Sequence, residues 1–121
     1  MFNRIDYVMV MVSNMARSVQ FYRDRLGISL KFESPEWTEF ETGDTVLALH
    51  GGGKLSTRAK EPIAGTASIG FYVPNLEEKY SELKEKGVVF TMPPTEREGE
   101  GIKLAVCLDP DGLPISIAQR K

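Results

Sequence analysis

Hydrophobic and polar residues follow two patterns in turn along the first half of the chain. Residues 4–12 are mostly apolar with several β-branched side chains, which predicts a strand covered on both faces. Ser13 and Asn14 then offer N-cap side chains, and apolar residues recur at helical spacing from Met15 until Gly27 stands where a helix ends. The pattern predicts a strand followed by an amphipathic helix of about three turns.

Three shorter apolar segments follow this helix. They lie at residues 28–33, 37–41 and 45–50, and Pro, Gly and Asp in the intervening turns predict a meander of strands. The connector at residues 51–65 is rich in glycine and charged residues and is expected to form a loop.

The second half repeats this order. It predicts a strand at 67–73, a helix from Leu76 to a stop at Gly87, and strands at 88–91, 103–108 and 113–118. The segment Val12–Met15 aligns with Val73–Leu76 at an offset of 61, and Ala48 aligns with Ser116 at an offset of 68. This self-similarity indicates an internal duplication.

The repeated pattern predicts an α+β fold built from two βαβββ modules, at residues 1–55 and 65–121, within a single domain spanning 1–121. Neither half has enough core to be stable alone, so each sheet must be buried by its helix and by the other half. We expect a pseudo-twofold arrangement in which a curled, partly open mixed sheet surrounds a concave cavity. The alternative is a filled, ferredoxin-like core.

Composition narrows the class of protein. The 121 residues are 41% hydrophobic and 26% charged, as in an ordinary globular domain. Fifteen basic and 17 acidic residues are interspersed, so no basic surface predicts a nucleic-acid partner. The apolar runs are strand-sized and the N-terminus lacks a signal-peptide pattern, so we expect a cytoplasmic protein without a membrane span. The single cysteine, Cys107, excludes an internal disulfide and is expected to be a small buried hydrophobe.

Two motifs carry a resemblance to a known family. Residues 12–27 read Val-Ser-Asn-Met-Ala-Arg-Ser-Val-Gln-Phe-Tyr-Arg-Asp-Arg-Leu-Gly, and the turn Asp109-Pro110-Asp111-Gly112 precedes the last strand. In this order and spacing they resemble the glyoxalase, bleomycin-resistance and extradiol-dioxygenase (vicinal oxygen chelate) superfamily, over essentially the whole chain.

The resemblance implies where a metal would be bound. Metal-dependent members carry His, Gln or Glu ligands on the first and last strands of each half. The corresponding positions here are Tyr7, Ser68, Ala48 and Ser116. None is a usual metal ligand, and among their immediate sequence neighbours only Asp6 has a suitable donor. The sequence therefore predicts a member without a metal or another cofactor.

Strand alternation predicts instead an aromatic and apolar lining with a few small hydroxyl residues. The candidate ligand-binding residues are Tyr7, Met9, Trp37, Ala48, His50, Ser68, Gly70, Tyr72 and Ser116. His50 is a candidate base or orienting group, although a histidine at a strand end is more often solvated. Glu39 or Glu41 could turn inward as a carboxylate anchor or simply keep an edge strand soluble. No catalytic residue is assigned.

These residues favour a non-enzymatic protein that sequesters an aromatic or hydrophobic small molecule, such as an antibiotic. The resemblance implies a homodimer. An alternative is an enzyme of the same superfamily, a glyoxalase-like lyase or isomerase or a dioxygenase-like protein with a metal-free or unusual site. A third hypothesis is an interaction module that uses the connector at 51–65 and a loop at 96–101.

Overall fold

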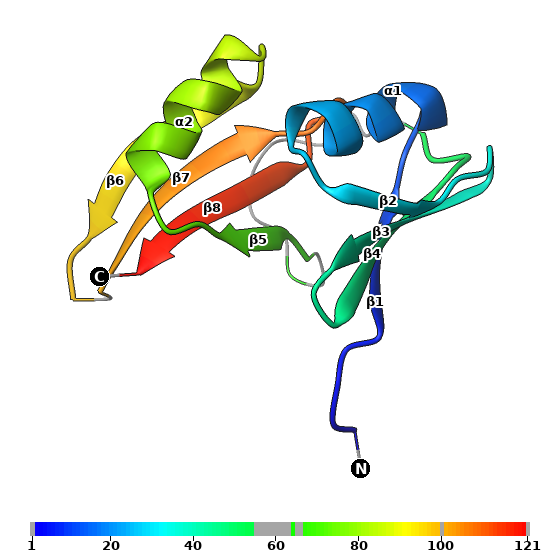
Figure 1. The fold of residues 1–121 in the computed structure, drawn as a ribbon, viewed down its shortest axis with the longest axis horizontal. Coiled ribbons are helices and arrows are strands. Elements are labelled where there is room, and N and C mark those ends of the chain that lie inside the picture. The colour runs from blue at the N-terminus through cyan, green and yellow to red at the C-terminus, as the bar shows by residue number, and fades with distance from the viewer. Residues whose placement is uncertain (1, 55–63, 65–66, 100, 121) are drawn as a thin grey trace. The chain divides into compact units, whose positions relative to one another are not determined.

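The computed structural model describes residues 2–54, 64, 67–99 and 101–120. The chain forms two compact units, Met1–Thr57 and Arg58–Lys121. Each unit has the element order β-α-β-β-β and a four-stranded mixed sheet that does not close on itself (Figure 1). This confirms the α+β class and the two βαβββ modules.

The first unit begins with β1, the strand nearest the N-terminus. Its elements are β1 (Tyr7–Met11), α1 (Met15–Gln20), the π-helical turn η1 (Phe21–Arg25), β2 (Ser29–Phe32), β3 (Trp37–Thr42) and β4 (Thr45–His50). The strand order is β1-β4-β3-β2, with β1 parallel to β4 and the other pairs antiparallel. Strand β1 is thus an edge strand, paired within its sheet only to β4.

The helix of the first unit starts and stops where the sequence places its caps. The Asn14 side chain accepts a 3.1 Å hydrogen bond from the Arg17 amide, and Gly27 has a φ of 75°, which favours glycine. The last turn is π-helical rather than α-helical, a change of helix type that the predicted three-turn amphipathic helix did not include. Apolar periodicity does not distinguish these two kinds of turn.

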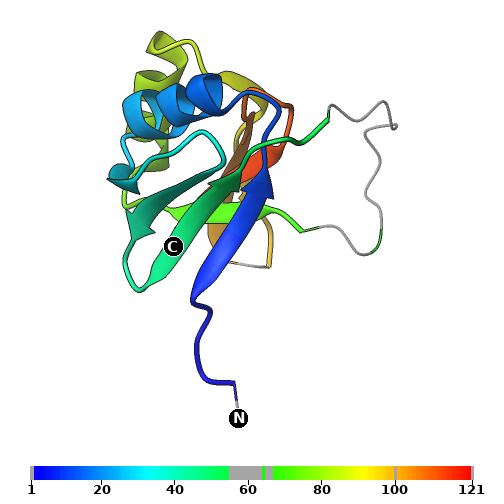
Figure 2. The ribbon, with the colours of Figure 1, turned by 90° about the vertical axis from the view of Figure 1, so that its right-hand side faces the viewer.

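This helix covers one face of the first sheet, as Figures 1 and 2 show. The ring of Tyr22 on η1 lies 6.0 Å from the ring of Phe40 on β3, centroid to centroid. Leu47 and Leu49 on β4 are buried on the same face as Phe40. We call the opposite face the open face of the first sheet.

The second unit repeats the arrangement. Its elements are β5 (Ile69–Tyr72), α2 (Leu76–Glu85), β6 (Val89–Arg97), β7 (Ile102–Leu108) and β8 (Pro114–Arg120), in the strand order β5-β8-β7-β6. Helix α2 packs on the sheet through the rings of Tyr80 and Phe90, whose centroids are 4.7 Å apart. Its first amide, on Leu76, donates a 2.7 Å hydrogen bond to the side chain of Gln119 on β8. The other face is the open face of the second sheet.

Strand β6 is longer than the sequence pattern predicts. The structure extends it to Arg97 instead of Thr91, so the predicted loop at 96–101 is wrong for its first two residues. The pairing with β7 shifts between Phe90 and Met92 and again between Met92 and Thr95, around Pro93 and Pro94. These irregularities broke the simple alternation on which the prediction depended.

The strand register repeats between the units. Met9 pairs with Ala48 across β1 and β4, and Gly70 pairs with Ser116 across β5 and β8. The parallel pairs β1–β4 and β5–β8 therefore have the same alignment in the two units, at the offsets found in the sequence.

Strand β1 is not covered on both faces, because Tyr7, Met9 and Met11 are 53%, 44% and 48% exposed. Most of the connector predicted at 51–65 lies outside the described residues. Within the described ranges, no helix combines the length and apolar character needed to cross a membrane.

Candidate functional site

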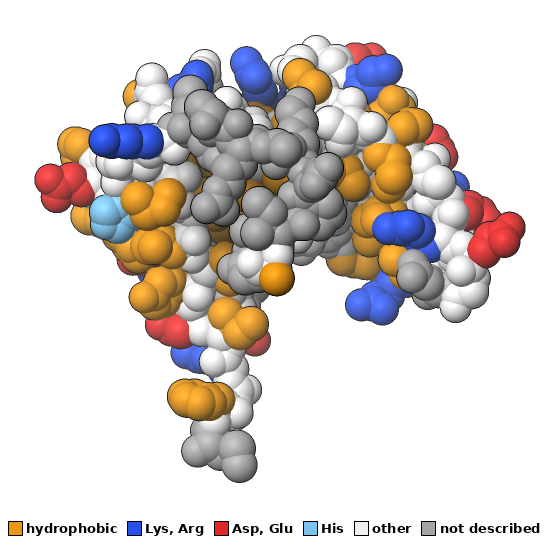
Figure 3. Space-filling model, turned by 180° about the vertical axis from the view of Figure 1, so that it is seen from behind, with side chains coloured by type: hydrophobic (Ala, Val, Ile, Leu, Met, Phe, Trp, Pro, Cys, Tyr) orange, Lys and Arg blue, Asp and Glu red, His pale blue; other side chains and the backbone are white. Residues whose placement is uncertain are grey.

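The open face of the first sheet gathers most of the predicted lining residues of the first half. Side chains alternate between faces along a strand, so the register assigns each residue to a side. The open-face positions of β1, β4 and β3 are Tyr7, Met9, Met11, Val46, Ala48, His50, Trp37, Glu39 and Glu41. Hydrophobic side chains are prominent in this view of the first unit (Figure 3).

Tyr7 and Trp37 meet across this face. Tyr7 lies on β1 and Trp37 on β3, and their ring centroids are 5.8 Å apart in an edge-to-face arrangement. Ala48 lies on the intervening strand β4, between Val46, which pairs with Tyr7, and His50, which pairs with Trp37. Its side chain is 0% exposed. Ala48 therefore contributes the room in which the two rings meet rather than an exposed contact surface.

A carboxylate is fixed beside the indole. Trp37 Nε1 donates a 2.8 Å hydrogen bond to Oε2 of Glu39, two residues further along β3. The ammonium of Lys31 lies 3.9 Å from Oε1 of the same carboxylate. Glu39 thus turns toward the open face, as the anchor alternative in the sequence allowed, and retains 28% side-chain exposure.

The turn before β3 holds Trp37 in place. Ser34 Oγ accepts a 3.0 Å hydrogen bond from the Trp37 amide and donates a 2.7 Å hydrogen bond to the Trp37 carbonyl. The Ser34 amide donates to the same carbonyl at 3.1 Å. These bonds fix the backbone from which the indole projects, which lowers the entropy cost of using this ring for binding.

His50 lies at the end of β4 with its ring next to the indole. The ring centroids of His50 and Trp37 are 6.0 Å apart, and His50 Nδ1 donates a 2.7 Å hydrogen bond to the Gly51 carbonyl. Because a carbonyl only accepts, this bond places a proton on Nδ1. In the neutral ring, Nε2 is then a hydrogen-bond acceptor.

The backbone at Gly51 passes close to the Pro35–Glu36 turn. A Cβ at Gly51 would lie 2.8 Å from the Pro35 carbonyl oxygen, which no real side chain tolerates. The Gly51 amide donates a 3.0 Å hydrogen bond to the Glu36 carbonyl. Glycine at this position therefore lets the end of β4, with His50, lie against the turn that supports Trp37.

The predicted lining residues of the second half lie on a separate sheet. Gly70, Tyr72 and Ser116 are on its open face, and Tyr72 is 60% exposed. Ser68 precedes β5, which begins at Ile69. The structure thus places the nine candidates in two groups, five on the first sheet and three on the second, with Ser68 outside the strands.

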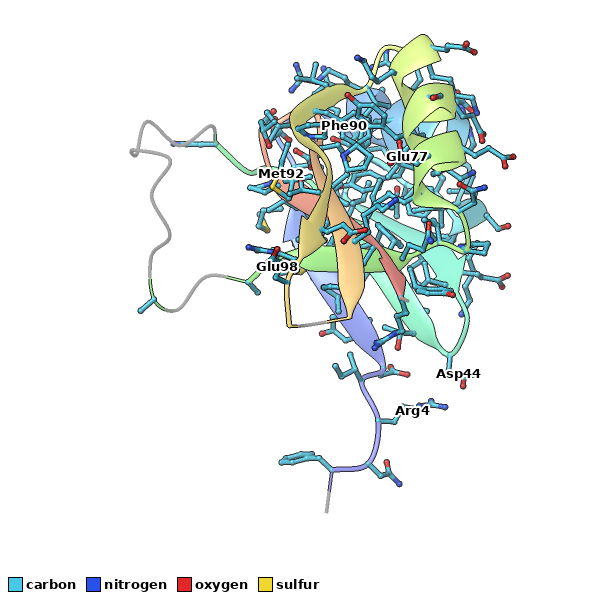
Figure 4. All side chains as sticks on the ribbon, turned by 90° about the vertical axis from the view of Figure 1, so that its left-hand side faces the viewer. Arg4, Asp44, Glu77, Phe90, Met92 and Glu98 are labelled. Carbon is cyan, nitrogen blue, oxygen red and sulfur yellow. The ribbon has the colours of Figure 1, made fainter. Side chains whose placement is uncertain are left out.

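The sequence analysis missed some residues on the open faces of the two sheets. Phe32 reaches the open face of the first sheet because the register between β2 and β3 shifts after Leu30. A bulge of this kind leaves no clear sequence signal. Met92 and Val106 pair on the open face of the second sheet, and Figure 4 shows Met92 turned away from α2 while Phe90 lies toward it. The alternation around Val106 did carry a signal for this position.

The residues at the positions implied by the resemblance do not fit a divalent metal. Tyr7, Ala48, Ser68 and Ser116 supply a phenol, a methyl group and two aliphatic hydroxyls, whereas catalytic metals in proteins need imidazole, carboxylate or thiolate ligands. Across the described ranges, no group of three or more His, Cys, Asp or Glu side chains is arranged to hold a metal ion.

Cys107 is not part of either open face. It pairs with Ile115 on the side of the second sheet that α2 covers, and it is 0% exposed. Burial raises the pKa of its thiol to about 11. At neutral pH the side chain is a protonated thiol and a weak nucleophile, as expected of a small core residue.

The fold and this arrangement can be compared with known proteins. The chain is 27% identical over 119 residues to the uncharacterized protein YraH of Bacillus subtilis, covering 91% of this chain and 93% of that protein. It is 27% identical over 121 residues to the virulence protein STM3117 of Salmonella typhimurium, covering 97% and 84% respectively.

Solved structures share the fold. The crystal structure of STM3117 matches with a TM-score of 0.77 and 26% identity, covering 100% of this chain and 99% of the other. A glyoxalase/dioxygenase from Nostoc punctiforme matches with a TM-score of 0.82 and 20% identity, covering 98% and 91%. The sequence profile of the Glyoxalase/Bleomycin resistance protein/Dioxygenase superfamily matches residues 4–117. The chain therefore belongs to this superfamily.

Proposed function

We propose that this protein binds an aromatic or hydrophobic small molecule on the open face of the first sheet, without a metal, and acts by sequestering it. The observation that carries this proposal is the exposed aromatic and methionine surface around Tyr7 and Trp37. Rings that are held in place stack on flat ligands, and methionines adapt to irregular ones. Protection by sequestration depends only on affinity and abundance.

The donor set supports a binding role over Lewis-acid catalysis. The four positions that the resemblance to metal-dependent members of the superfamily implies carry no imidazole, carboxylate or thiolate. The Tyr7 and Trp37 rings and the Met9 and Met11 side chains occupy the open face instead. Metal analysis of natively purified protein tests this part, and a stoichiometric transition metal would contradict it.

Ligand binding is tested by calorimetric titration with planar aromatic compounds. Tyr7→Ala and Trp37→Ala should each weaken binding by about tenfold, because each removes one of the two rings that meet on the open face. Tyr72→Ala tests separately whether the open face of the second sheet binds these compounds by itself. Circular dichroism of each variant establishes that the fold is retained.

Phe2→Ala is the matched control. Phe2 is an exposed aromatic residue outside every strand and helix, so its removal changes the hydrophobic surface without changing the proposed site. The affinity of the Phe2→Ala variant for the aromatic compounds should equal that of the unsubstituted protein. Unchanged binding in both Tyr7→Ala and Trp37→Ala would show that the ligand lies elsewhere.

One observation favours a second candidate function, proton transfer to or from a bound ligand. The bond from His50 Nδ1 to the Gly51 carbonyl leaves Nε2 of the neutral ring as a proton acceptor at the edge of the same face. A ligand with an acidic C–H bond would then exchange that hydrogen for deuterium in heavy water. Exchange catalysed by the protein and lost in His50→Gln supports the enzyme, and its absence supports sequestration alone.

A further inference from the structure

We infer that the open face of the first sheet selects aromatic ligands that carry a protonated amine, an inference that rests on the proposed function. It follows from the polar groups that surround the rings. A ligand must complement these groups as well as stack on Tyr7 and Trp37, because a buried polar atom left without a partner reduces affinity.

The nitrogen donors of this face are already engaged within the protein. Trp37 Nε1 donates to Glu39, and His50 Nδ1 donates to the Gly51 carbonyl. The side-chain groups on β1, β3 and β4 that remain for a ligand are the carboxylate oxygens of Glu39 and Glu41, the Nε2 acceptor of His50 and the hydroxyl of Tyr7. Three of these four accept hydrogen bonds and do not donate them, so the matching ligand group is a donor.

The charges on this face also favour a positively charged ligand group. The open-face positions of β1, β4 and β3 include the carboxylates Glu39 and Glu41 and no lysine or arginine. Glu39 lies beside the indole, and the electron-rich faces of Trp37 and Tyr7 attract cations as well. An anionic aromatic compound would meet repulsion at the same place.

Lys31 is the competing cation. Its ammonium lies 3.9 Å from Oε1 of Glu39, and its side chain is 49% exposed. Exposed ion pairs of this kind contribute little to stability. A ligand ammonium can therefore displace Lys31 from the carboxylate at small cost, and removal of Lys31 should favour the ligand.

Three probes with one ring system separate charge from stacking. Naphthylmethylammonium, naphthylmethanol and naphthoate differ in the polar group and share the naphthalene ring. By calorimetry at low salt, the ammonium should bind about tenfold more tightly than the alcohol, and naphthoate should bind most weakly. Added salt should narrow the difference, since partly exposed charges are screened.

Glu39→Gln is the decisive variant. The amide oxygen can still accept the hydrogen bond from Trp37, so the position of the ring is retained while the negative charge is removed. The preference for the ammonium over the alcohol should shrink to about twofold or less, and naphthylmethanol should bind as before. Lys31→Gln should instead raise the affinity for the ammonium and leave naphthylmethanol unaffected.

The outcomes distinguish the two proposals. Equal binding of ammonium and alcohol, or a preference for naphthoate, overturns the charge selection and leaves the aromatic binding function standing. An ammonium preference that survives in Glu39→Gln also overturns the assignment to this carboxylate. Failure of all three probes to bind overturns the proposed function, and the charge selection with it.

Discussion

Trp37 donates the hydrogen of its indole Nε1 to Oε2 of Glu39 at a distance of 2.8 Å, within a single strand. Because alternate residues of a strand share a face, the ring and the carboxylate project together. The bond holds both groups: it fixes the rotation of the indole and aims the carboxylate along the open face.

Trp37→Phe tests this coupling. Phenylalanine retains an aromatic ring but has no N–H donor, so Glu39 becomes free to rotate toward Lys31. We expect affinity for naphthylmethylammonium to fall by about tenfold, with a smaller fall for naphthylmethanol. Titration calorimetry measures both values. Equal losses for the two probes would mean that only the size of the ring matters.

Ala48→Leu tests the meeting of the two rings. Ala48 is fully buried and lies on β4 between Val46, which pairs with Tyr7, and His50, which pairs with Trp37, so we expect a larger side chain to push the two rings apart. We expect a loss of about 1–3 kcal/mol in the free energy of unfolding. Urea denaturation measures this loss, and nuclear Overhauser effects between the two rings should disappear.

Ala48→Gly is the control for that experiment, since it preserves the room between the rings. It should cost about 1 kcal/mol through the added backbone freedom and leave the contact between the rings intact. A leucine variant as stable as the unsubstituted protein, with the ring contact preserved, would show that Ala48 does not lie beneath the rings.

Gln119→Ala should loosen the start of α2. The side-chain oxygen of Gln119 accepts the hydrogen of the Leu76 amide, one of the helix amides that have no partner within the helix. Its removal should lower the free energy of unfolding by about 1 kcal/mol. Gln119→Glu retains an acceptor oxygen and should be close to unsubstituted protein. Hydrogen exchange at the Leu76 amide provides a local measurement, and unchanged exchange in the alanine variant would argue against the bond.

Cys107 makes stability depend on alkaline pH. Burial raises the pKa of the folded thiol from 9.0 to about 11, so the unfolded chain ionises first as pH rises. The stabilising contribution of the neutral thiol is therefore fully present below pH 9 and is lost between pH 9 and about 11. Urea denaturation across this range should show a decline in unfolding free energy that is reduced in Cys107→Ala. Parallel declines in the two proteins would assign the effect to other groups.

The sequence could predict the fold because its signals are local. Helix caps at Asn14 and Asn75 and alternation along β4 and β8 each depend on neighbouring residues. The π-helical turn η1 and the bulge after Leu30 could not be predicted from the sequence, since they change the backbone conformation without changing the apolar pattern.

The site is predictable to a lesser degree. Alternation places Tyr7, Met9, Ala48 and His50 on one face, and the structure has them there. The approach of Tyr7 to Trp37 depends on the register of three strands whose residues are far apart in the sequence. Whether these residues bind a ligand stays a prediction. The hydrogen bond between Trp37 and Glu39 could have been predicted from the sequence, because two residues separated by one position on a strand share a face.

The irregular strand β6 also bears on how the protein behaves at high concentration. Its far side is an edge of the second sheet, where backbone groups could recruit a strand from another molecule and begin aggregation. Pro93 and Pro94 lie in the middle of this strand, and neither residue has an amide hydrogen to offer. The longest edge in the two sheets is thereby a poor template for strand addition, and the shift in register around the prolines bends it further from the flat geometry that fibrils need.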